Sequence, residues 1–397
     1  MRILLLAKKP PYPARDGEAI AIGQMAKGLA DLGHAVTLLY MNTAKHHFPA
    51  AEIPPMYGVT FISHEVRAGI GAIGALRNLL GTKPYHVDRF FSKSFKDKVL
   101  TLDAEHHFDV IQAEGLYLVQ YLPLSGTDSV AKRIYRSHNL EFEIWQNVAD
   151  HQFKKFRKRY LQIQANRLKS YELEVLKTHV DGVLPISTVD TGYYQTLMPK
   201  LACMHAPTGM EIPGASPNLV TGHDIYCIGG LDWLPNIEGL YWFFEAVWPK
   251  IKAMLPESTM HLAGRNAPKH FGEALPEGVH FYGEVPDAVA FAADKAVCVV
   301  PLLSGSGMKI KIAEAMAVGK VVVTTYKGAE GMPEGMDLHL YVADDPMEFA
   351  QLVTGLLLSP ESTRDKGLDA QRYMMRNLSN SAIAERLIDF YQTLSPQ

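Results

Sequence analysis

Residues 299–325, VVPLLSGSGMKIKIAEAMAVGKVVVTT, decide the fold of this chain. An apolar run suited to a buried parallel strand leads into a glycine-rich turn, and a helical pattern follows at about residues 309–318. A second apolar run begins directly after Gly319. Strand, turn, helix and strand in this order are the repeating unit of a doubly wound α/β domain with a parallel sheet.

The turn in this stretch also contains the residue types that bind a diphosphate. Gly305 and Gly307 leave room for a ligand against the backbone, and the following helix start offers N–H groups and a favourable dipole to an anion. Lys309 and Lys311 add positive charge at that point, and Glu314 can accept hydrogen bonds from ribose hydroxyls. A purely structural turn is the alternative, but it would not need this density of glycine and lysine.

The same unit recurs along the chain in both directions. We expect strands at residues 2–6, 35–40, 59–62, 110–113, 132–136, 182–186 and 202–206, and again at 224–228, 260–263, 279–282, 296–301, 320–324 and 340–342. We expect helices at about residues 19–32, 142–178, 237–254, 309–318 and 381–394. A chain of 397 residues is too long for one ordinary core, and the pattern predicts two domains, 1–210 and 211–378, with a final helical segment at 379–397.

Composition narrows the classes of protein that remain. Hydrophobic residues make up 47% and charged residues 20%, which is typical of a globular protein. The apolar run at the N-terminus is too short for a secretory signal or a membrane span, so we expect a cytoplasmic protein. Cys203, Cys227 and Cys298 fit neither a metal site nor a disulfide framework, and we expect no bound metal.

Charge is distributed unevenly between the two halves. Residues 1–210 have 25 Lys and Arg against 19 Asp and Glu, whereas the remainder has 14 against 23. This asymmetry indicates an anionic partner for the first half. Nucleic acid is a poor candidate, because the chain contains no RNA- or DNA-binding motif.

Two loops in the first half are further candidates for a ligand site. Residues 8–17 follow the first strand and end at Gly17, which allows a close approach of the backbone ahead of a helix start; a plain tight turn is the alternative. His138 follows the strand at 132–136, where a histidine can donate to a phosphate or a sugar hydroxyl. A structural histidine is the alternative there.

Two other nucleotide-binding classes are excluded by their missing motifs. Gly305 and Gly307 begin a GxGxxG pattern, but its third glycine position is Ile310, and the N-terminal turn lacks the fingerprint as well. No GxxxxGK[ST] occurs, so a P-loop NTPase is excluded too.

Together these residues resemble those of the large family 4 (group 1) of retaining glycosyltransferases. The resemblance covers nearly the whole chain and is most specific in SGSGMKIKIAEAMAVGKVVVTT at 304–325 and GAEG at 328–331. It also includes PPYPARDGE at 10–18, RSHNLEFEIW at 136–145, GGLDWLPNIEGLYWFF at 229–244 and LAGRNAP at 262–268. It implies an α/β fold of the GT-B type: two Rossmann-like domains facing across a cleft, with a C-terminal helix that crosses back to the first.

The resemblance also implies roles for individual residues. Glu314 matches the second of two family glutamates and would contact the nucleotide ribose, while the first falls on Ser306, a departure that leaves the amides of Gly307 and Met308 to contact the sugar. The usual arginine after the first strand of the second domain is missing. The residues expected to bind the donor are Gly17, Gly230, Arg265, Gly305, Ser306, Gly307, Met308, Lys309, Lys311 and Glu314, and those expected to be catalytic are His138, Glu314 and Lys311.

The implied activity is transfer of a sugar, with retention of configuration, from a nucleotide-diphosphate donor to a glycan or lipid-linked acceptor. The resemblance implies hexosyl transfer in cell-surface polysaccharide or glycolipid synthesis, without a metal or separate cofactor. The basic run Lys154, Lys155, Arg157, Lys158 and Arg159 fits a lipid-diphosphate acceptor or the anionic inner face of a membrane, with a solvated helix face as an equal alternative. A GT-B nucleotide-sugar epimerase and an inactive homologue that acts as a binding partner remain open.

Overall fold

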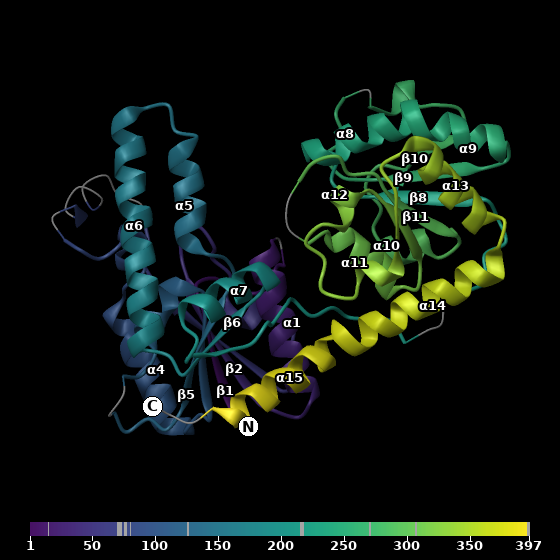
Figure 1. Cartoon of the computed structure of the whole chain (residues 1–397). Helices are drawn as coiled ribbons and strands as arrows, with labels where there is room; N and C mark the ends of the chain where they lie inside the picture. The colour runs from purple at the N-terminus through teal and green to yellow at the C-terminus, as the bar shows by residue number, and fades with distance from the viewer. Residues whose placement is uncertain are drawn as a thin grey trace. The chain divides into compact units, whose positions relative to one another are not determined.

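The computed structural model describes residues 1–14, 16–69, 74, 78–79, 81–124, 127–214, 218–269, 271–305 and 308–394. The chain divides into two compact units (Figure 1). Unit 1 comprises Met1–Gly209 together with Asn380–Gln397, and unit 2 comprises Met210–Ser379. The boundaries expected from the sequence, after residues 210 and 378, each lie one residue from these.

Unit 1 is built on a parallel sheet of seven strands in the order β3-β2-β1-β4-β5-β6-β7. The strands are β1 (Arg2–Ala7), β2 (Ala35–Asn42), β3 (Val59–Glu65), β4 (Val110–Glu114), β5 (Lys132–Ser137), β6 (Gly182–Pro185) and β7 (Ala202–Cys203). Every residue of β4 and nearly every residue of β1 is buried, because helices cover both faces of a doubly wound sheet. All seven strands lie where the sequence pattern predicts them.

The helices of unit 1 include the last one in the chain. They are α1 (Gly17–Asp31), α3 (Tyr85–Asp88), α4 (Lys93–His106), α5 (Glu141–Asp150), α6 (Lys155–Thr178), α7 (Thr188–Leu197) and α15 (Asn380–Thr393), with short 3-10 turns η1 (Ala50–Glu52) and η2 (Leu116–Tyr121). α15 packs on α1, where a Cβ added at Gly28 would come within 2.5 Å of the Asn380 carbonyl oxygen. The C-terminal helix therefore belongs to the first unit.

The single long helix predicted at residues 142–178 is wrong, because the structure has two helices there. α5 and α6 fold back on each other as a hairpin whose turn is at the end farthest from the sheet (Figure 1). Nζ of Lys169 lies 5.0 Å from the centre of the Phe142 ring across the hairpin. One straight helix of this length would extend about 55 Å and leave such apolar surface uncovered, so folding back is favoured although neither Gly nor Pro marks the turn.

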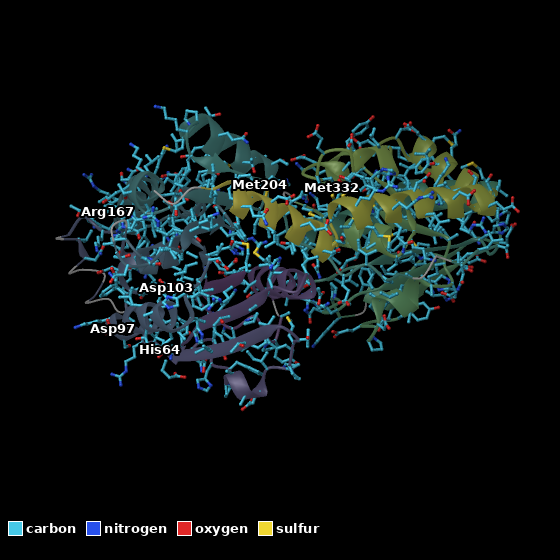
Figure 2. All side chains as sticks on the ribbon, turned by 90° about the horizontal axis from the view of Figure 1, so that it is seen from below. His64, Asp97, Asp103, Arg167, Met204 and Met332 are labelled. Carbon is cyan, nitrogen blue, oxygen red and sulfur yellow. The ribbon has the colours of Figure 1, made fainter. Side chains whose placement is uncertain are left out.

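α6 is anchored to the rest of unit 1 near its middle. Arg167, labelled in Figure 2, donates to the carbonyl oxygens of Asn78 at 2.9 Å and Leu79 at 3.1 Å. Deeper in the unit, Glu172 accepts hydrogen bonds from the hydroxyls of Tyr194 and Tyr135. Burial raises the pKa of Glu172 to about 7. These contacts fix the base of the hairpin against β5 and α7.

Unit 2 is a second parallel sheet, in the order β10-β9-β8-β11-β12-β13. Its strands are β8 (Asp224–Ile228), β9 (Thr259–Ala263), β10 (Val279–Phe281), β11 (Val297–Val300), β12 (Val321–Thr324) and β13 (Leu340–Val342). Its helices are α8 (Leu234–Trp242), α9 (Trp248–Met254), α10 (Ala288–Ala292), α11 (Ile310–Ala317), α12 (Tyr326–Ala329), α13 (Pro346–Leu357) and α14 (Pro360–Asn377), with short turns η4 (Phe271–Ala274) and η5 (Asp337–His339). Both units therefore confirm the predicted doubly wound α/β architecture.

The helix predicted at residues 237–254 begins earlier, at Leu234, and is interrupted. A π-helical turn, η3 (Phe243–Val247), separates α8 from α9. It lies just ahead of Pro249, whose ring is incompatible with the usual hydrogen bond of an uninterrupted α-helix. The predicted boundaries missed this interruption.

Among the helices of the described residues, none is both long enough and apolar enough to cross a membrane.

Helix α8 lies very close to the backbone that follows β11, and this approach leads to a prediction about stability. A Cβ added at Gly239 in α8 would lie 1.5 Å from the carbonyl oxygen of Pro301, directly after β11. We expect Gly239→Ala to force α8 off the sheet and lower the free energy of unfolding by about 1–3 kcal/mol, measured by denaturant unfolding. Gly355→Ala in α13 is the matched control, because a Cβ there meets nothing within 4 Å. It should stabilise the protein by about 0.5–1 kcal/mol, and equal effects of the two substitutions would contradict the packing described here.

Candidate functional site

The sheet of unit 2 has its topological switch point between β8 and β11. β8 is the first strand of the unit and pairs with β11 in the middle of the sheet, and later strands extend outward from each of them. Ligands of open parallel sheets bind beyond the carboxyl ends of the strands at such a point. Residues 229–233 after β8 and residues 301–309 after β11 both begin there, and they include most of the positions predicted to bind the donor.

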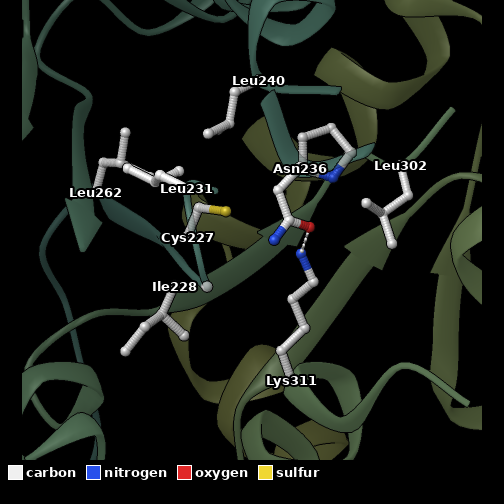
Figure 3. A pocket seen from close by; sticks show the side chains of 10 residues that line it. Cys227, Ile228, Leu231, Asn236, Leu240, Leu262, Leu302 and Lys311 are labelled. Carbon is white, nitrogen blue, oxygen red and sulfur yellow. Dashed lines mark hydrogen bonds between the residues drawn. The ribbon is translucent and has the colours of Figure 1, made fainter. Parts of the chain in front are cut away.

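Lys311, on the first turn of α11, faces the loop after β8. Its Nζ donates to Oδ1 of Asn236 at 2.6 Å, and Nδ2 of Asn236 donates to the carbonyl oxygen of Gly230 at 2.7 Å. Figure 3 shows Lys311 and Asn236 meeting in a small hollow whose other side chains, including Cys227 and Leu240, are mostly apolar. This arrangement places an ammonium group beside the N-terminus of α11, where the dipole of the helix also favours an anion.

Lys309 points to a different loop. It is the N-cap residue of α11, it is buried, and its Nζ donates to the carbonyl oxygen of Glu330 at 3.2 Å, just after α12. Burial lowers the pKa of Lys309 below its ordinary value. Lys309 and Lys311 therefore lie against different loops, and Lys311 is the one at the switch point.

Glu314 follows Lys311 by three residues, which places both on one face of α11. Its side chain is exposed, and partial desolvation raises its pKa. A carboxylate in this position can accept hydrogen bonds from two neighbouring hydroxyls.

The turn ahead of α11 is described only in part. Gly305 has a φ of +105°, which favours glycine, and Met308 is half-buried. Ser306 and Gly307 lie outside the described residues, so the predictions made for them stay predictions.

Gly230 and Arg265 lie next to each other at the same edge of the sheet. The carbonyl oxygen of Arg265 accepts from the backbone N–H of Leu231 at 2.9 Å, and a Cβ added at Gly230 would lie 4.0 Å from Nε of Arg265. The Arg265 side chain is exposed. The loops after β8 and β9 are therefore joined by a backbone hydrogen bond. The loop after β8 is also the one that Lys311 contacts through Asn236.

Two lysines in the loop after β1 in unit 1 are paired with nearby acidic residues. Nζ of Lys9 lies 2.7 Å from Oδ1 of Asp16 and 2.9 Å from Oε2 of Glu18, and Nζ of Lys8 lies 3.2 Å from Oε1 of Glu18. Although burial by itself lowers the pKa of Lys9, Glu18 and Asp16 raise it above its ordinary value. Gly17 begins α1, and a Cβ there would meet nothing within 4 Å. Space therefore does not require glycine at this position.

His138, after β5, is held by a buried carboxylate that the sequence analysis missed. Its Nε2 lies 2.7 Å from Oε2 of Glu114, the last residue of β4. Glu114 is 0% exposed and also accepts from Nη1 of Arg136 at 3.3 Å. Burial alone would raise the pKa of Glu114, but Arg136 and then His138 lower it below its ordinary value. An ionised Glu114 accepts a hydrogen bond from the N–H of Nε2, which leaves Nδ1 of His138 as the nitrogen available to a ligand.

The network around Glu114 extends to the last helix. Nε2 of Gln112 donates to Oε1 of Glu114 at 2.6 Å, and the hydroxyl of Tyr391 in α15 donates to Oε1 of Gln112 at 2.6 Å. Tyr391 is fully buried. α15 therefore supports the loop that contains His138 through a chain of three hydrogen bonds.

The predicted basic run lies at the other end of the hairpin from His138. α5 begins three residues after His138 and has ten residues, which separates the hairpin turn from that loop by about 15 Å. Lys154, Lys155, Arg157, Lys158 and Arg159 form the turn and the start of α6. The structure therefore does not bring them together with His138.

One segment of the chain matches a known protein family. Residues 222–359 match the protein family described as "Glycosyl transferases group 1". This segment is therefore similar to the group 1 glycosyltransferases. The match includes the loop after β8, Arg265 and all of α11, so the switch-point residues described above lie inside it.

The whole chain also resembles proteins of known sequence and structure. A Klebsiella pneumoniae protein described as an uncharacterized 44.6 kDa protein in the cps region is 22% identical, over 96% of this chain and 97% of its own. Sucrose-phosphate synthase from Thermosynechococcus elongatus has a TM-score of 0.61 at 18% identity, covering 99% of this chain and 98% of the other. HepE from Anabaena, in complex with UDP-glucose, has a TM-score of 0.57 at 13% identity, covering 99% and 100%. The fold is thus shared with glycosyltransferases of the GT-B type.

Sequence reasoning missed several polar residues of the two sites. Glu114 was signalled by a lone carboxylate at the end of the apolar run VIQAE, after a strand that was itself predicted. Asn236 and Tyr391 gave no local signal, because their partners Lys311 and Gln112 are distant in sequence. Contacts of that kind follow from the strand order and cannot be derived from spacing.

The buried ion pair yields a prediction of pH dependence. Glu114→Gln leaves Arg136 buried without its counter-charge, and we expect the free energy of unfolding near neutral pH to fall by about 3–5 kcal/mol. The pKa of Glu114 is lowered from 4.5, so its stabilising effect is present above that pH and is lost as pH falls through the lowered pKa. The wild type and the variant should therefore differ less in their free energy of unfolding at acidic pH than at neutral pH, as measured by denaturant unfolding.

The double variant Glu114→Gln/Arg136→Met separates the ion pair from the rest of the network. Because it removes both buried charges, it should recover most of the lost stability. A double variant as unstable as Glu114→Gln alone would show that the loss has another cause.

Proposed function

We propose that this protein is a glycosyltransferase that moves a hexosyl group from a nucleotide-diphosphate sugar to a glycan or lipid-linked acceptor, with retention of configuration. The observation that carries the proposal is the position of Lys311 at the switch point of unit 2. Its ammonium group is held by Asn236, which itself donates to the carbonyl oxygen of Gly230. A pyrophosphate bound there would lie beside a helix N-terminus and an ammonium group together.

The chemistry of the leaving group explains why this arrangement suits sugar transfer. When the bond between sugar and diphosphate breaks, negative charge develops on the phosphate oxygens. Preorganised positive charge and N–H groups lower the barrier by stabilising that charge. Lys311 and the start of α11 supply both, and Glu314 on the same face of the helix is placed to accept from the ribose hydroxyls.

His138 and unit 1 have the complementary role in this proposal. Glu114 fixes the ring of His138 through Nε2, so Nδ1 can hold a hydroxyl of the transferred sugar in one orientation. The histidine then orients the sugar, and the departing phosphate takes the proton of the acceptor hydroxyl. Binding of the acceptor by unit 1 agrees with the positive charge of residues 1–210.

The relatives support a donor and a setting for the reaction. HepE, which shares the fold, has been crystallised with UDP-glucose, and the Klebsiella relative is described as a protein of the cps region. We infer a UDP-hexose as the first donor to test and cell-surface polysaccharide synthesis as the process.

A thermal-shift screen of UDP-, GDP-, ADP- and dTDP-sugars tests donor binding. A true donor at about a hundred times its Kd should stabilise the protein by about 2.7 kcal/mol. Lys311→Met keeps the aliphatic stem but removes the charge. We expect it to weaken the binding of nucleoside diphosphates by about 10- to 100-fold, which corresponds to the loss of one hydrogen bond to a charged group. Calorimetric titration of the same nucleotides measures the loss.

Lys250→Met in α9 is the matched control, because its Nζ donates to the carbonyl oxygen of Ala246 in the preceding turn and lies away from the switch point. It should bind nucleotides as the wild type does. Unchanged affinity in Lys311→Met would refute the placement of the diphosphate. Isomerisation of the donor sugar without any acceptor would instead identify an epimerase, and binding without turnover of any donor would identify an inactive homologue.

Metal removal tests the source of the stabilising charge. If Lys311 and the start of α11 replace a divalent cation, sugar transfer should proceed at the same rate in EDTA as in Mg²⁺. The measurement is product formation with the donor found above. Loss of activity in EDTA, restored by added Mg²⁺, would show that a cation and not the lysine carries the role.

A further inference from the structure

The turn between α5 and α6 is the most strongly basic segment of the chain. From residue 151 to residue 171 there are seven Lys and Arg and no Asp or Glu. Five of these cations lie at residues 154–159. Within the described part of the chain, Lys158 is the only one of the five that forms an ion pair, with Nζ 3.7 Å from Oδ1 of Asp150. We call residues 151–160 the hairpin tip.

The hairpin tip also exposes apolar side chains that the fold does not cover. Phe153 is 99% exposed and Phe156 is 93% exposed, whereas no other phenylalanine of the described residues is more than 50% exposed. On α5, Ile144 and Val148 are also exposed and lie one turn apart on the same face. The hairpin therefore exposes apolar side chains on α5 as well as at its tip.

The shape of the hairpin decides which kind of partner can use these groups. The tip is the convex end of two antiparallel helices and lies away from the sheet of unit 1 (Figure 1). Lys154, Lys155, Arg157 and Arg159 are all exposed around the two phenylalanines. A convex tip that exposes two aromatic side chains together with four cations matches the interface of a lipid bilayer, where aromatic rings enter the acyl boundary and cations meet phosphates.

We propose that the hairpin tip docks on an anionic lipid bilayer, with Phe153 and Phe156 inserted below the headgroups. The surrounding lysines and arginines bind the lipid phosphates. Nucleic acid fits less well, because the sequence contains no RNA- or DNA-binding motif. The proposal is independent of the donor site, which lies in unit 2.

Binding of the full chain to vesicles tests this docking. The wild type should cosediment with vesicles of phosphatidylcholine and phosphatidylglycerol, should bind vesicles of phosphatidylcholine alone far less, and should dissociate as salt is raised. Phe153→Ser/Phe156→Ser should reduce affinity for the anionic vesicles at least about tenfold. Lys154→Ala/Lys155→Ala should reduce it about 25-fold, at roughly fivefold for each cation.

Matched controls keep the test specific to the tip. Tyr57, 94% exposed, and Lys200, also exposed, lie elsewhere in unit 1, and Tyr57→Ser and Lys200→Ala should bind vesicles as the wild type does. Phe153→Leu/Phe156→Leu retains apolar side chains and should retain most of the binding. Thermal unfolding and the nucleotide-induced shift should be unchanged in every tip variant, which separates loss of docking from loss of the fold or of the donor site.

Three results would overturn the proposal. The first is a wild type that does not bind anionic vesicles. The second is a serine variant that binds these vesicles as tightly as the wild type. The third is a single-stranded oligonucleotide that binds more tightly than vesicles do, through the same tip residues. The last result would identify nucleic acid as the partner.

Discussion

The ion pair between Glu114 and Arg136, buried in unit 1, is the constraint on which the first of the two sites depends. Each charge would be costly to bury alone, so the two residues must stay together at the ends of adjacent strands β4 and β5. His138 shares the same carboxylate, and its ring orientation is therefore fixed by the requirement to compensate Arg136. A catalytic role for His138 is thus tied to the stability of the sheet itself.

The fold could be predicted from the sequence because parallel strands buried on both faces are nearly continuous apolar runs. β8 and β13 lie at the predicted residues, and the others differ from the prediction by a few residues at their ends. The hairpin at residues 142–178 could not be predicted, because the helical pattern is continuous and only tertiary packing favours the fold-back. Tertiary packing also explains why Asn236 was missed. Lys311 stands out in the sequence beside a glycine-rich turn, whereas its contact with Asn236 joins residues that are 75 positions apart.

Part of the excess positive charge of the first half is compensated by ion pairs within the fold. Lys8 and Lys9 are neutralised by Asp16 and Glu18, and Arg136 is neutralised by Glu114. Charge that is compensated within the fold produces little field outside it. The five cations at residues 154–159, by contrast, lie close together in one segment, the hairpin tip, which overall charge counts alone could not locate.

The length of α5 links the tip to the chemistry of the acceptor. With the tip at a bilayer surface, the loop containing His138 lies about 15 Å away along the hairpin, because ten helical residues rise about 1.5 Å each. A hydroxyl buried among headgroups would not reach that loop. An acceptor sugar that extends from its lipid by a diphosphate and one or more further units would reach it. The hairpin would then act as a spacer that selects for elongated, lipid-linked acceptors.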